Sequence, residues 1–514
     1  MSQNGGQARS GRARPSKEQE VEAVVSDRGK DAAMIAVLDV GKTNVKLSAA
    51  AADGTIVETL SVPNPVRPGP PWRHHDLQSL GEWVFDTLAA LSRRYDLAAL
   101  VTAGHGSGGV LTGADPDAGD GAVLPMIDYE QPLPDDIREA YAPFAGTFLD
   151  RGSATMHGAT HQARQLYWMA QREPGAFAKA RWYLGLPQYW AWRLSGVAAS
   201  EASFLGAQSH LWNVAEGRWA PIVSARGWEH LMPPFAKAWH ALGPVRPELV
   251  KRFGLPNGLS VLTGGHDSSL NHYRYHAAGL RDFTVISTGT WIVGFSGSTP
   301  IERLDEHRGM TLNSDVFGKP LGGILTMGGR EFSHIAGKDA PAADVPVDIL
   351  GRLISERVFA TPSFGDDDGL FPGSAGRGRI LGRSAETPME RKALAILYCA
   401  LLTIECLEAL GDDSLVVLDG SFLRDPLYAQ LVAAVLPDRQ VRVNLDAYGV
   451  AAGAALLAGE ETRRRPALLS LGEPADLTAL KTELRGYAAD WRSLARAAPG
   501  RQDEFEHTKG SFHD

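Results

Sequence analysis

The 514-residue sequence predicts an α/β protein with two related domains. One observation is a strand, a glycine turn and a second strand near the start of the chain, and another is a similar unit in its middle. The units align when Gly41 is set on Gly289, and further identities then fall at equivalent positions: Val37 and Val285, Val45 and Val293, Ser48 and Ser296. In addition, strand and helix signals alternate around both units. Repeated units suggest two related domains that face each other, although two glycine-turn hairpins can also match by chance.

The composition is that of an ordinary globular protein, with 44% hydrophobic and 22% charged residues. The chain is long enough for two or three domains with sizeable cores. Its net charge of −9 gives no broad cationic field for nucleic acid or for an anionic membrane surface. No run approaches the ~18 apolar residues of a membrane-spanning helix. We therefore expect neither a nucleic-acid nor a membrane partner.

Residues 1–30 are rich in Gly, Ser, Arg and Glu and lack the apolar core of a signal peptide, which predicts a disordered N-terminal tail. Cys399 and Cys406 fall in one predicted helix, where seven residues at ~1.5 Å each place them about 10 Å apart, beyond disulfide reach. Buried reduced thiols of this kind predict a cytoplasmic protein.

The first structured element is an apolar strand over 34–40, followed by a polar turn at Gly41 and a second strand over 45–48. The turn reads Gly-Lys-Thr, which is typical of P-loops. That motif needs a glycine where this chain has Ala36, so the sequence argues against a P-loop.

The later elements follow from capping, turn and periodicity signals. Thr387-Pro388-Met389-Glu390 combines a capping box with proline at the first helical position, and Gly411 ends that helix. The expected order is a helix from 79, a strand at 97–102 ending in a Gly-rich loop, a helix beyond 160, the helix at 387–411, a strand at 415–418, a helix from 425, a strand at 441–443 and a small-residue helix at 448–455.

The stretch 263–295 carries the clearest chemistry. Its first half places a carboxylate, Asp267, on a Gly-rich turn. Its second half is a strand, a turn flanked by Thr288 and Thr290, and another strand, which suits a phosphate held between backbone N–H groups and hydroxyls. A base and an anion cradle suggest a site where a proton leaves and a phosphoryl group arrives.

Four stretches together resemble the FGGY family of carbohydrate kinases, and they occur in the family's order: Leu38-Asp39-Val40-Gly41-Lys42-Thr43-Asn44, Gly264-Gly265-His266-Asp267, Ser287-Thr288-Gly289-Thr290-Trp291 and Leu418-Asp419-Gly420-Ser421. The resemblance implies two ribonuclease-H-like domains around a central cleft, the fold shared with actin, hexokinase and the Hsp70 ATPase. Residues 31–279 would bind the sugar and supply the base, and 280–460 would bind the nucleotide. Residues 461–514 would form a peripheral helix and a polar tail.

The resemblance also assigns roles to residues. Asp267 would be the general base, and Asp39 would orient Mg²⁺ through its water shell. ATP would be bound by Gly41, Lys42, Thr43, Asn44, Thr288, Gly289, Thr290, Gly420 and Ser421. The sugar would be bound by His105, Gly106, Asp128 and Asp267.

Structural alternatives stay open for these residues. Asp267 could cap a helix that starts at Ser268, and Asp39 could bond its own turn. His105 and Asp128 could be ordinary loop residues, and Lys42 stands where the family often has Thr or Ser. The chain also has a single glycine at Gly420 where the family commonly has two or three, which leaves the preferred nucleotide open.

The implied activity is transfer of the γ-phosphoryl group of ATP to a hydroxyl of a ketose sugar of the L-fuculose, L-rhamnulose, xylulose or ribulose type. The expected partners are the sugar and ATP, and a homodimer is left open. The alternatives on the same fold are an actin- or Hsp70-like ATPase and a regulator that senses sugar without phosphorylating it.

Overall fold

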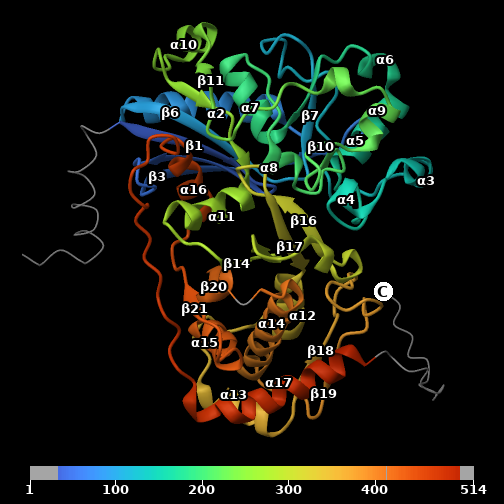
Figure 1. Cartoon of the computed structure of the whole chain (residues 1–514), viewed down its shortest axis with the longest axis vertical. Coiled ribbons are helices and arrows are strands. Elements are labelled where there is room, and N and C mark those ends of the chain that lie inside the picture. The colour runs from blue at the N-terminus through green and yellow to red at the C-terminus, as the bar shows by residue number, and fades with distance from the viewer. Residues whose placement is uncertain (1–32, 413, 498–514) are drawn as a thin grey trace, which may run out of the picture.

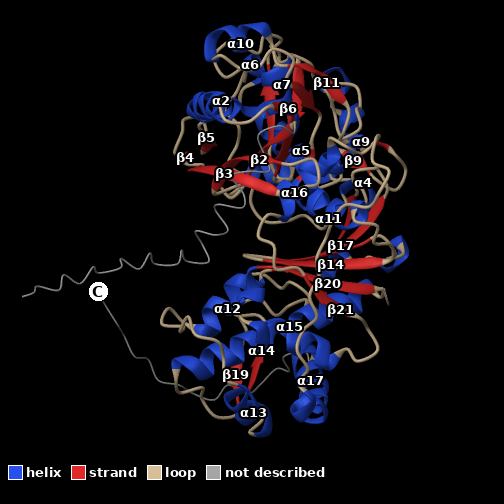
Figure 2. Ribbon diagram, turned by 90° about the vertical axis from the view of Figure 1, so that its left-hand side faces the viewer, coloured by secondary structure: helices blue, strands red, loops and turns tan. Residues whose placement is uncertain are grey.

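The computed structural model describes residues 33–412 and 414–497, which form two lobes stacked along the long axis of the molecule (Figure 1). The expected N-terminal tail and the end of the polar C-terminal tail lie outside the described residues. In each lobe a mixed sheet is covered by helices (Figure 2).

The sheet of the N-terminal lobe runs in the order β11-β12-β6-β1-β2-β3, and β13 pairs with β6. Helices cover both faces of the sheet, and its central strand β1 is accordingly apolar from Met34 to Leu38. Helices α2, α7 and α10 pack on one face, and α11 and α16 pack on the other. The elements are β1 (Met34–Val40), β2 (Asn44–Ala50), β3 (Ile56–Pro63), β6 (Leu97–Gly104), β11 (Ala241–Pro244), β12 (Ser260–Leu262), β13 (Gly265–His266), α2 (Leu77–Ser92), α7 (Leu186–Ser195), α10 (Pro247–Phe253), α11 (Asp267–Ala277) and α16 (Gly449–Leu457).

A smaller layer of short elements extends this lobe and packs around a second core that is rich in aromatic side chains. It consists of β4 (Val66–Arg67), β5 (His74–His75), β7 (Gly109–Thr112), α3 (Asp135–Tyr141), α4 (Phe148–Arg151), α5 (Gln162–Arg172), α6 (Pro174–Phe177), β8 (Trp182–Gly185), α8 (Ala202–Leu205), β9 (Trp212–Asn213), β10 (Arg218–Trp219) and α9 (Pro221–Ala225).

The sheet of the C-terminal lobe runs in the order β16-β17-β15-β14-β20-β21. The large core of this lobe gathers around α14, to which α12, α13, α15 and α17 contribute. The elements are β14 (Phe283–Thr288), β15 (Ile292–Ser296), β16 (Met310–Ser314), β17 (Pro320–Thr326), α12 (Gly328–Ala336), α13 (Val347–Ser355), β18 (Phe359–Thr361), β19 (Arg379–Leu381), α14 (Pro388–Leu410), β20 (Leu415–Gly420), α15 (Pro426–Val435), β21 (Val441–Val443) and α17 (Lys481–Arg496).

The two sheets share one topology. In the first, β1 pairs antiparallel with β2 and parallel with β6, and in the second β14 pairs antiparallel with β15 and parallel with β20. The predicted repeat and the two-domain α/β fold are therefore confirmed. The alignment across the turn is wrong by one residue, because Val40 pairs with Val45 whereas Thr288 pairs with Ile292. The structural equivalent of Val45 is thus Ile292 rather than Val293.

Helices α11 and α16 lie between the two sheets (Figure 2). Gly453 lets them touch, since a Cβ there would stand 1.9 Å from the carbonyl oxygen of Leu270. The small-residue helix expected at 448–455 exists, and it packs on the sheet of the N-terminal lobe although its sequence follows the C-terminal sheet. The joint between the lobes is thus built from segments far apart in the chain.

Helix α14 contradicts the expectation that no segment of the chain is long and apolar enough to span a membrane. It is the one helix among the described residues that is long and apolar enough to cross a membrane, and 94% of its apolar window is buried inside the protein. The expectation that no segment reaches this length is therefore wrong for α14. Both cysteines lie on this helix as free, buried thiols, as expected.

Candidate active site

Three neighbouring strand ends bring the predicted catalytic groups together. Asp39 pairs in register with Ala103 of β6, and Ala103 pairs with Gly265 of β13. The residues that follow these two strands are His105 and Asp267. Because the parallel strands β1, β6 and β13 end at one edge of the sheet, Asp39, His105 and Asp267 share that edge.

Asp267 is the first residue of α11, and its side chain is 26% exposed. Its Oδ1 accepts hydrogen bonds from the backbone N–H (2.5 Å) and the hydroxyl (3.1 Å) of Ser268, and lies 3.2 Å from His266 Nε2. No hydrogen bond from another described residue reaches Oδ2. The cap position belongs to His266, so Asp267 is not the helix cap of the structural alternative. One carboxylate oxygen is anchored and the other is free.

Asp39 is a carboxyl whose charge the fold disfavours. Burial and, to a smaller extent, the negative charge of Asp267 raise its pKa to about 7, although Lys46 across the hairpin opposes the shift. A cation bound beside Asp39 would relieve this cost. The effect of the Asp267 charge on Asp39 also shows that the two carboxylates lie close together.

This pair suits a magnesium ion better than an all-protein metal cage. No group of three or more His, Cys, Asp or Glu side chains that could hold a metal occurs among the residues that the structure describes. Magnesium typically keeps several waters and takes one or two carboxylates plus phosphate oxygens. Asp39, with its raised pKa, is the carboxylate that could hold it.

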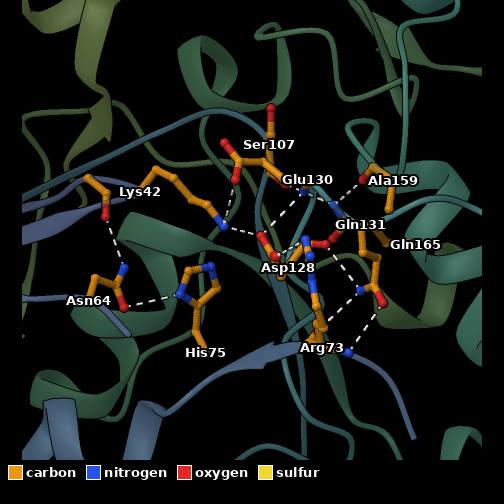
Figure 3. Close-up of polar contacts among 11 residues, drawn as sticks. Lys42, Asn64, Arg73, His75, Ser107, Asp128, Glu130, Gln131, Ala159 and Gln165 are labelled. Carbon is orange, nitrogen blue, oxygen red and sulfur yellow. Dashed lines mark hydrogen bonds and ion pairs between the residues drawn. The ribbon is translucent and has the colours of Figure 1, made fainter. Parts of the chain in front are cut away.

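Asp128 lines a polar pocket of the N-terminal lobe together with Lys42 and Arg73 (Figure 3), and His105 lies beside it, against Tyr129. The two ring nitrogens of His105 are buried, and neither has a hydrogen-bond partner among the described residues. Burial lowers its pKa to about 3, so the ring is neutral at physiological pH. It packs against Tyr129 with ring centroids 5.2 Å apart. A buried imidazole with two unused nitrogens can bond a hydroxyl that enters the pocket.

Asp128 is almost fully buried and bridges two cations (Figure 3). One of its oxygens pairs with Lys42, and Oδ2 accepts from Arg73 Nη2 at 2.6 Å. Gly106, by contrast, supports the loop: a Cβ there would stand 2.6 Å from Ala207 Cβ, and its carbonyl accepts from a glutamine of α5. Among the residues predicted to bind the sugar, Gly106 therefore has a structural role in the loop next to His105.

The first hairpin turn is held from below by Asn64 (Figure 3). Its side-chain amide donates to the carbonyl of Gly41 at 2.9 Å, and its backbone N–H donates to the carbonyl of Thr43 at 2.8 Å. Thr43 and Asn44 are exposed on this turn. Lys42, predicted to approach the ATP phosphates, points to Asp128 and lies 5.1 Å from the Tyr129 ring centroid. The structure therefore groups Lys42 with the predicted sugar residues.

The second hairpin turn opens a large cavity of the C-terminal lobe. Gly289 and Thr290 line a space of about 950 Å³ together with Ser421. The hydroxyl of Thr288 faces inward instead, where it donates to the carbonyl of Asp419 at 2.8 Å and accepts from the N–H of Phe422 at 3.1 Å. Thr288 thus fastens the next strand end rather than facing the cavity.

Gly420 adopts a left-handed backbone with φ +94°, and a Cβ there would stand 2.1 Å from the carbonyl oxygen of Thr288. The glycine brings Ser421 into a second cavity, of about 440 Å³, which Asp39 also lines. Ser421 borders both cavities, so the large cavity of the C-terminal lobe and the cavity lined by Asp39 adjoin at this residue.

Sequence reasoning missed the helix that forms another wall of the large cavity. Gly329, Arg330 and Ser333 of α12 line it, and a Cβ on Gly329 would stand 2.4 Å from the carbonyl oxygen of Gly289. The signal was present as a Gly-Gly pair between a strand and a helix, a pattern that lets a helix N-terminus approach another backbone. Also missed was the buried pair of Lys392 and Asp425, 2.8 Å apart in the cavity wall.

Helix α11 connects the two halves of the site. Asp267 begins it, and further along Asn271 and Tyr275 donate to Oδ2 of Asp419 at 3.0 and 2.8 Å. Asp419 is the last residue but one of β20, beside Gly420. Helix α11 therefore carries the free Oδ2 of Asp267 and is hydrogen-bonded to β20, the strand that leads into the large cavity.

Comparisons with known proteins agree with this architecture. The sequence pattern of the N-terminal domain of the FGGY family of carbohydrate kinases matches residues 34–272, and that of the carbohydrate kinase FGGY C-terminal domain matches residues 280–466. The L-fuculokinase of Salmonella typhi is 24% identical over 296 residues, and that of Escherichia coli (strain K12) is 25% identical over 298 residues. Each match covers 55% of this chain and 61% of the relative, so the chain spans less than two thirds of their length.

Solved structures extend the likeness over nearly the whole chain. A carbohydrate kinase from Novosphingobium aromaticivorans is 28% identical with a TM-score of 0.81, covering 91% of this chain and 99% of its own. A xylulose kinase from Lactobacillus acidophilus, 17% identical with a TM-score of 0.73 over 90% and 99%, shares the fold. With both family domains matched in order and the repeated sheets in place, the chain belongs to the FGGY family of carbohydrate kinases.

Proposed function

We propose that the protein is an ATP-dependent kinase that phosphorylates a hydroxyl of a ketose sugar, with Asp267 as the general base. The observation that carries the proposal is the free Oδ2 of Asp267, at the sheet edge shared by Asp39 and His105. Family membership supports the reaction class, and the two L-fuculokinases among the relatives support a ketose of the L-fuculose type.

In the proposed reaction the sugar lies in the polar pocket of the N-terminal lobe. A sugar hydroxyl donates its proton to Oδ2 of Asp267 while its oxygen forms a bond to the γ-phosphorus of ATP. The bond from that phosphorus to the bridging oxygen breaks, and ADP leaves with the electron pair. His105 is neutral and accepts or donates a hydrogen bond to another hydroxyl, which orients the sugar.

The nucleotide occupies the large cavity, with its phosphates at the turn of Gly289 and Thr290 and at Ser421. Asp39 would be the residue that holds magnesium. When bound, the ion offsets the negative charge of the phosphate oxygens. Closure of the lobes about α11 and α16 would exclude water that otherwise competes with the sugar for the phosphoryl group. The cytoplasmic location and a homodimer stay predictions.

The test is ADP release measured across L-fuculose, L-rhamnulose, xylulose and ribulose, each as the ketose, with wild type and Asp267→Asn. We expect one ketose to raise turnover well above the sugar-free rate. Loss of the base should lower kcat by about 10²- to 10⁴-fold while ADP binding stays within about threefold. The matched control is Asp86→Asn, an exposed carboxylate on α2.

Full activity of Asp267→Asn would remove the base from the mechanism. Turnover that no sugar raises would point instead to an actin- or Hsp70-like ATPase, and sugar binding without ADP release would point to a sensor.

A further inference from the structure

A separate cavity of about 580 Å³ in the C-terminal lobe is lined by arginines. It lies among β18, β19, the loop between them and the end of α17 (Figure 1). Its lining contains Arg308, Arg377, Arg379 and Arg496 and, within residues 33–412 and 414–497, no acidic residue. It shares no lining residue with the large cavity of the proposed nucleotide site. In a chain with net charge −9, this cluster is a local excess of positive charge.

Most of these guanidinium groups have no counter-charge. Arg496 donates to Glu405 at 2.6 Å. For Arg308, Arg377 and Arg379, the described part of the chain supplies neither an ion pair nor a hydrogen-bond acceptor. Like charges around one concavity repel each other, and low-dielectric walls focus their field on a ligand. An anion in the cavity would be attracted by all three.

Among the described residues, the acidic loop beside the cavity makes no ion pair with the arginines of the cavity. The carboxylate of Asp368 is taken up by its own loop, where it accepts from the backbone N–H of Gly373 at 2.7 Å and of Ala375 at 2.8 Å. Asp368 is not a lining residue. The Asp368 carboxylate is therefore held by its own loop rather than paired with an arginine of the cavity.

The floor of the cavity is apolar. Leu370 and Phe371 are 2% and 7% exposed, and Pro362 and Pro372 stand beside them. A volume of this size suits a small molecule. A cavity with arginines on its wall and apolar side chains at its floor suits a ligand that has an anionic group to pair with the arginines and a carbon skeleton to contact the floor.

We propose that this cavity binds a small phosphate monoester, such as a sugar phosphate. Its phosphate pairs with Arg308, Arg377 and Arg379, and its carbon body lies against Phe371. The planar fork of arginine matches phosphate oxygens two at a time, which a lysine cannot do. The site is distinct from the proposed active site, so its occupancy does not depend on the kinase reaction.

The test is isothermal titration calorimetry on the full chain with glucose 6-phosphate and with inorganic phosphate. The variant is Arg377→Gln with Arg379→Gln, both exposed, so the fold is not at stake. The matched control is Arg464→Gln with Arg465→Gln, which removes the same charge from exposed positions outside the cavity. We expect saturable binding of glucose 6-phosphate, tighter than that of inorganic phosphate. The cavity variant should weaken it about tenfold or more, and the control by less than about twofold.

Three results would overturn the assignment. One is the absence of saturable glucose 6-phosphate binding to the wild type. The second is an equal loss in the two double variants, or no loss in either, since binding would then be a general charge effect or lie elsewhere. The third is equal affinity for inorganic phosphate, which would reduce the cavity to an unspecific anion patch.

Discussion

Replacing Asp39 with asparagine should make the protein more stable at alkaline pH while removing a group that the proposed reaction needs. Burial and the charge of Asp267 raise the pKa of Asp39 from 3.8 to about 7. One pKa unit corresponds to about 1.4 kcal/mol, so ionising Asp39 in the folded protein costs about 4 kcal/mol. Asparagine keeps the size of the protonated side chain and never ionises.

The sign follows from proton linkage. Below pH 3.8 the carboxyl is protonated in both the folded and the unfolded chain, and its titration costs nothing. Between 3.8 and about 7 the folded chain keeps a proton that the unfolded chain has released, so the unfolding free energy of the wild type falls as the pH rises. Above about 7 the full cost is present. The stability of Asp39→Asn relative to wild type should therefore rise by about 3 kcal/mol between pH 5 and pH 8.

The assay is urea unfolding of both proteins at pH 5 and pH 8, without nucleotide or magnesium. Asp86→Asn, which removes an exposed carboxylate, serves as the control and should show less than about 0.5 kcal/mol of pH-dependent difference. If Asp39→Asn and wild type differed by the same amount at both pH values, Asp39 would not be a buried carboxyl with a raised pKa. The argument for a cation beside it would then fail.

Two further substitutions test how the turns are built. Lys42→Met should raise the KM for the sugar about tenfold and change the KM for ATP less than threefold, because Lys42 pairs with the buried Asp128. Steady-state kinetics measures both constants. A large change in the KM for ATP and a small one in the KM for the sugar would show that Lys42 acts on the phosphates instead. Gly420→Ala should lower the unfolding free energy by about 3 kcal/mol or more, measured by urea titration, and weaken ADP binding, because its Cβ would strike Thr288. Gly376→Ala is the control, since its φ is +67° but nothing stands within 4 Å; equal losses in the two variants would refute the clash.

Helices, strands and turns whose sequence signals lie within a few neighbouring residues were predicted correctly. The capping box of Thr387 and Glu390 forms, with Glu390 N–H donating to Thr387 Oγ1 at 3.1 Å, and the helix ends at Gly411 as expected. The first hairpin and the strand that ends at Gly420 also lie where apolar runs and turn residues put them. In each case the signal and the element occupy the same few residues.

Contacts between distant segments could not be predicted in this way. Asn64, which holds the first turn, belongs to no motif, and its role depends on Gly41, which lies 23 residues earlier. Helix α16 is apolar and small-residue rich, but nothing in its sequence says which sheet it covers. Asp128, the partner of Lys42, is 86 positions away in the chain. The sequence therefore shows that Lys42 is charged, but the direction of its side chain is known only from the fold.

The turns of the two repeated hairpins differ in length by one residue, and this difference affects the residues of the candidate active site. In the first hairpin, residues 41–44 separate the last strand pair, whereas residues 289–291 do so in the second. A slip of one residue exchanges the faces of a strand, so each sheet keeps its core only if the turn length and the strand pattern change together. They do so here: Val45 and Ile292 are the buried equivalents, and Val293 is only half-buried. The longer first turn carries Lys42, which reaches the pocket of Asp128, while the shorter second turn leaves Gly289 flush against α12. Divergence of the repeated turns thus separates a polar pocket in one lobe from the large cavity in the other.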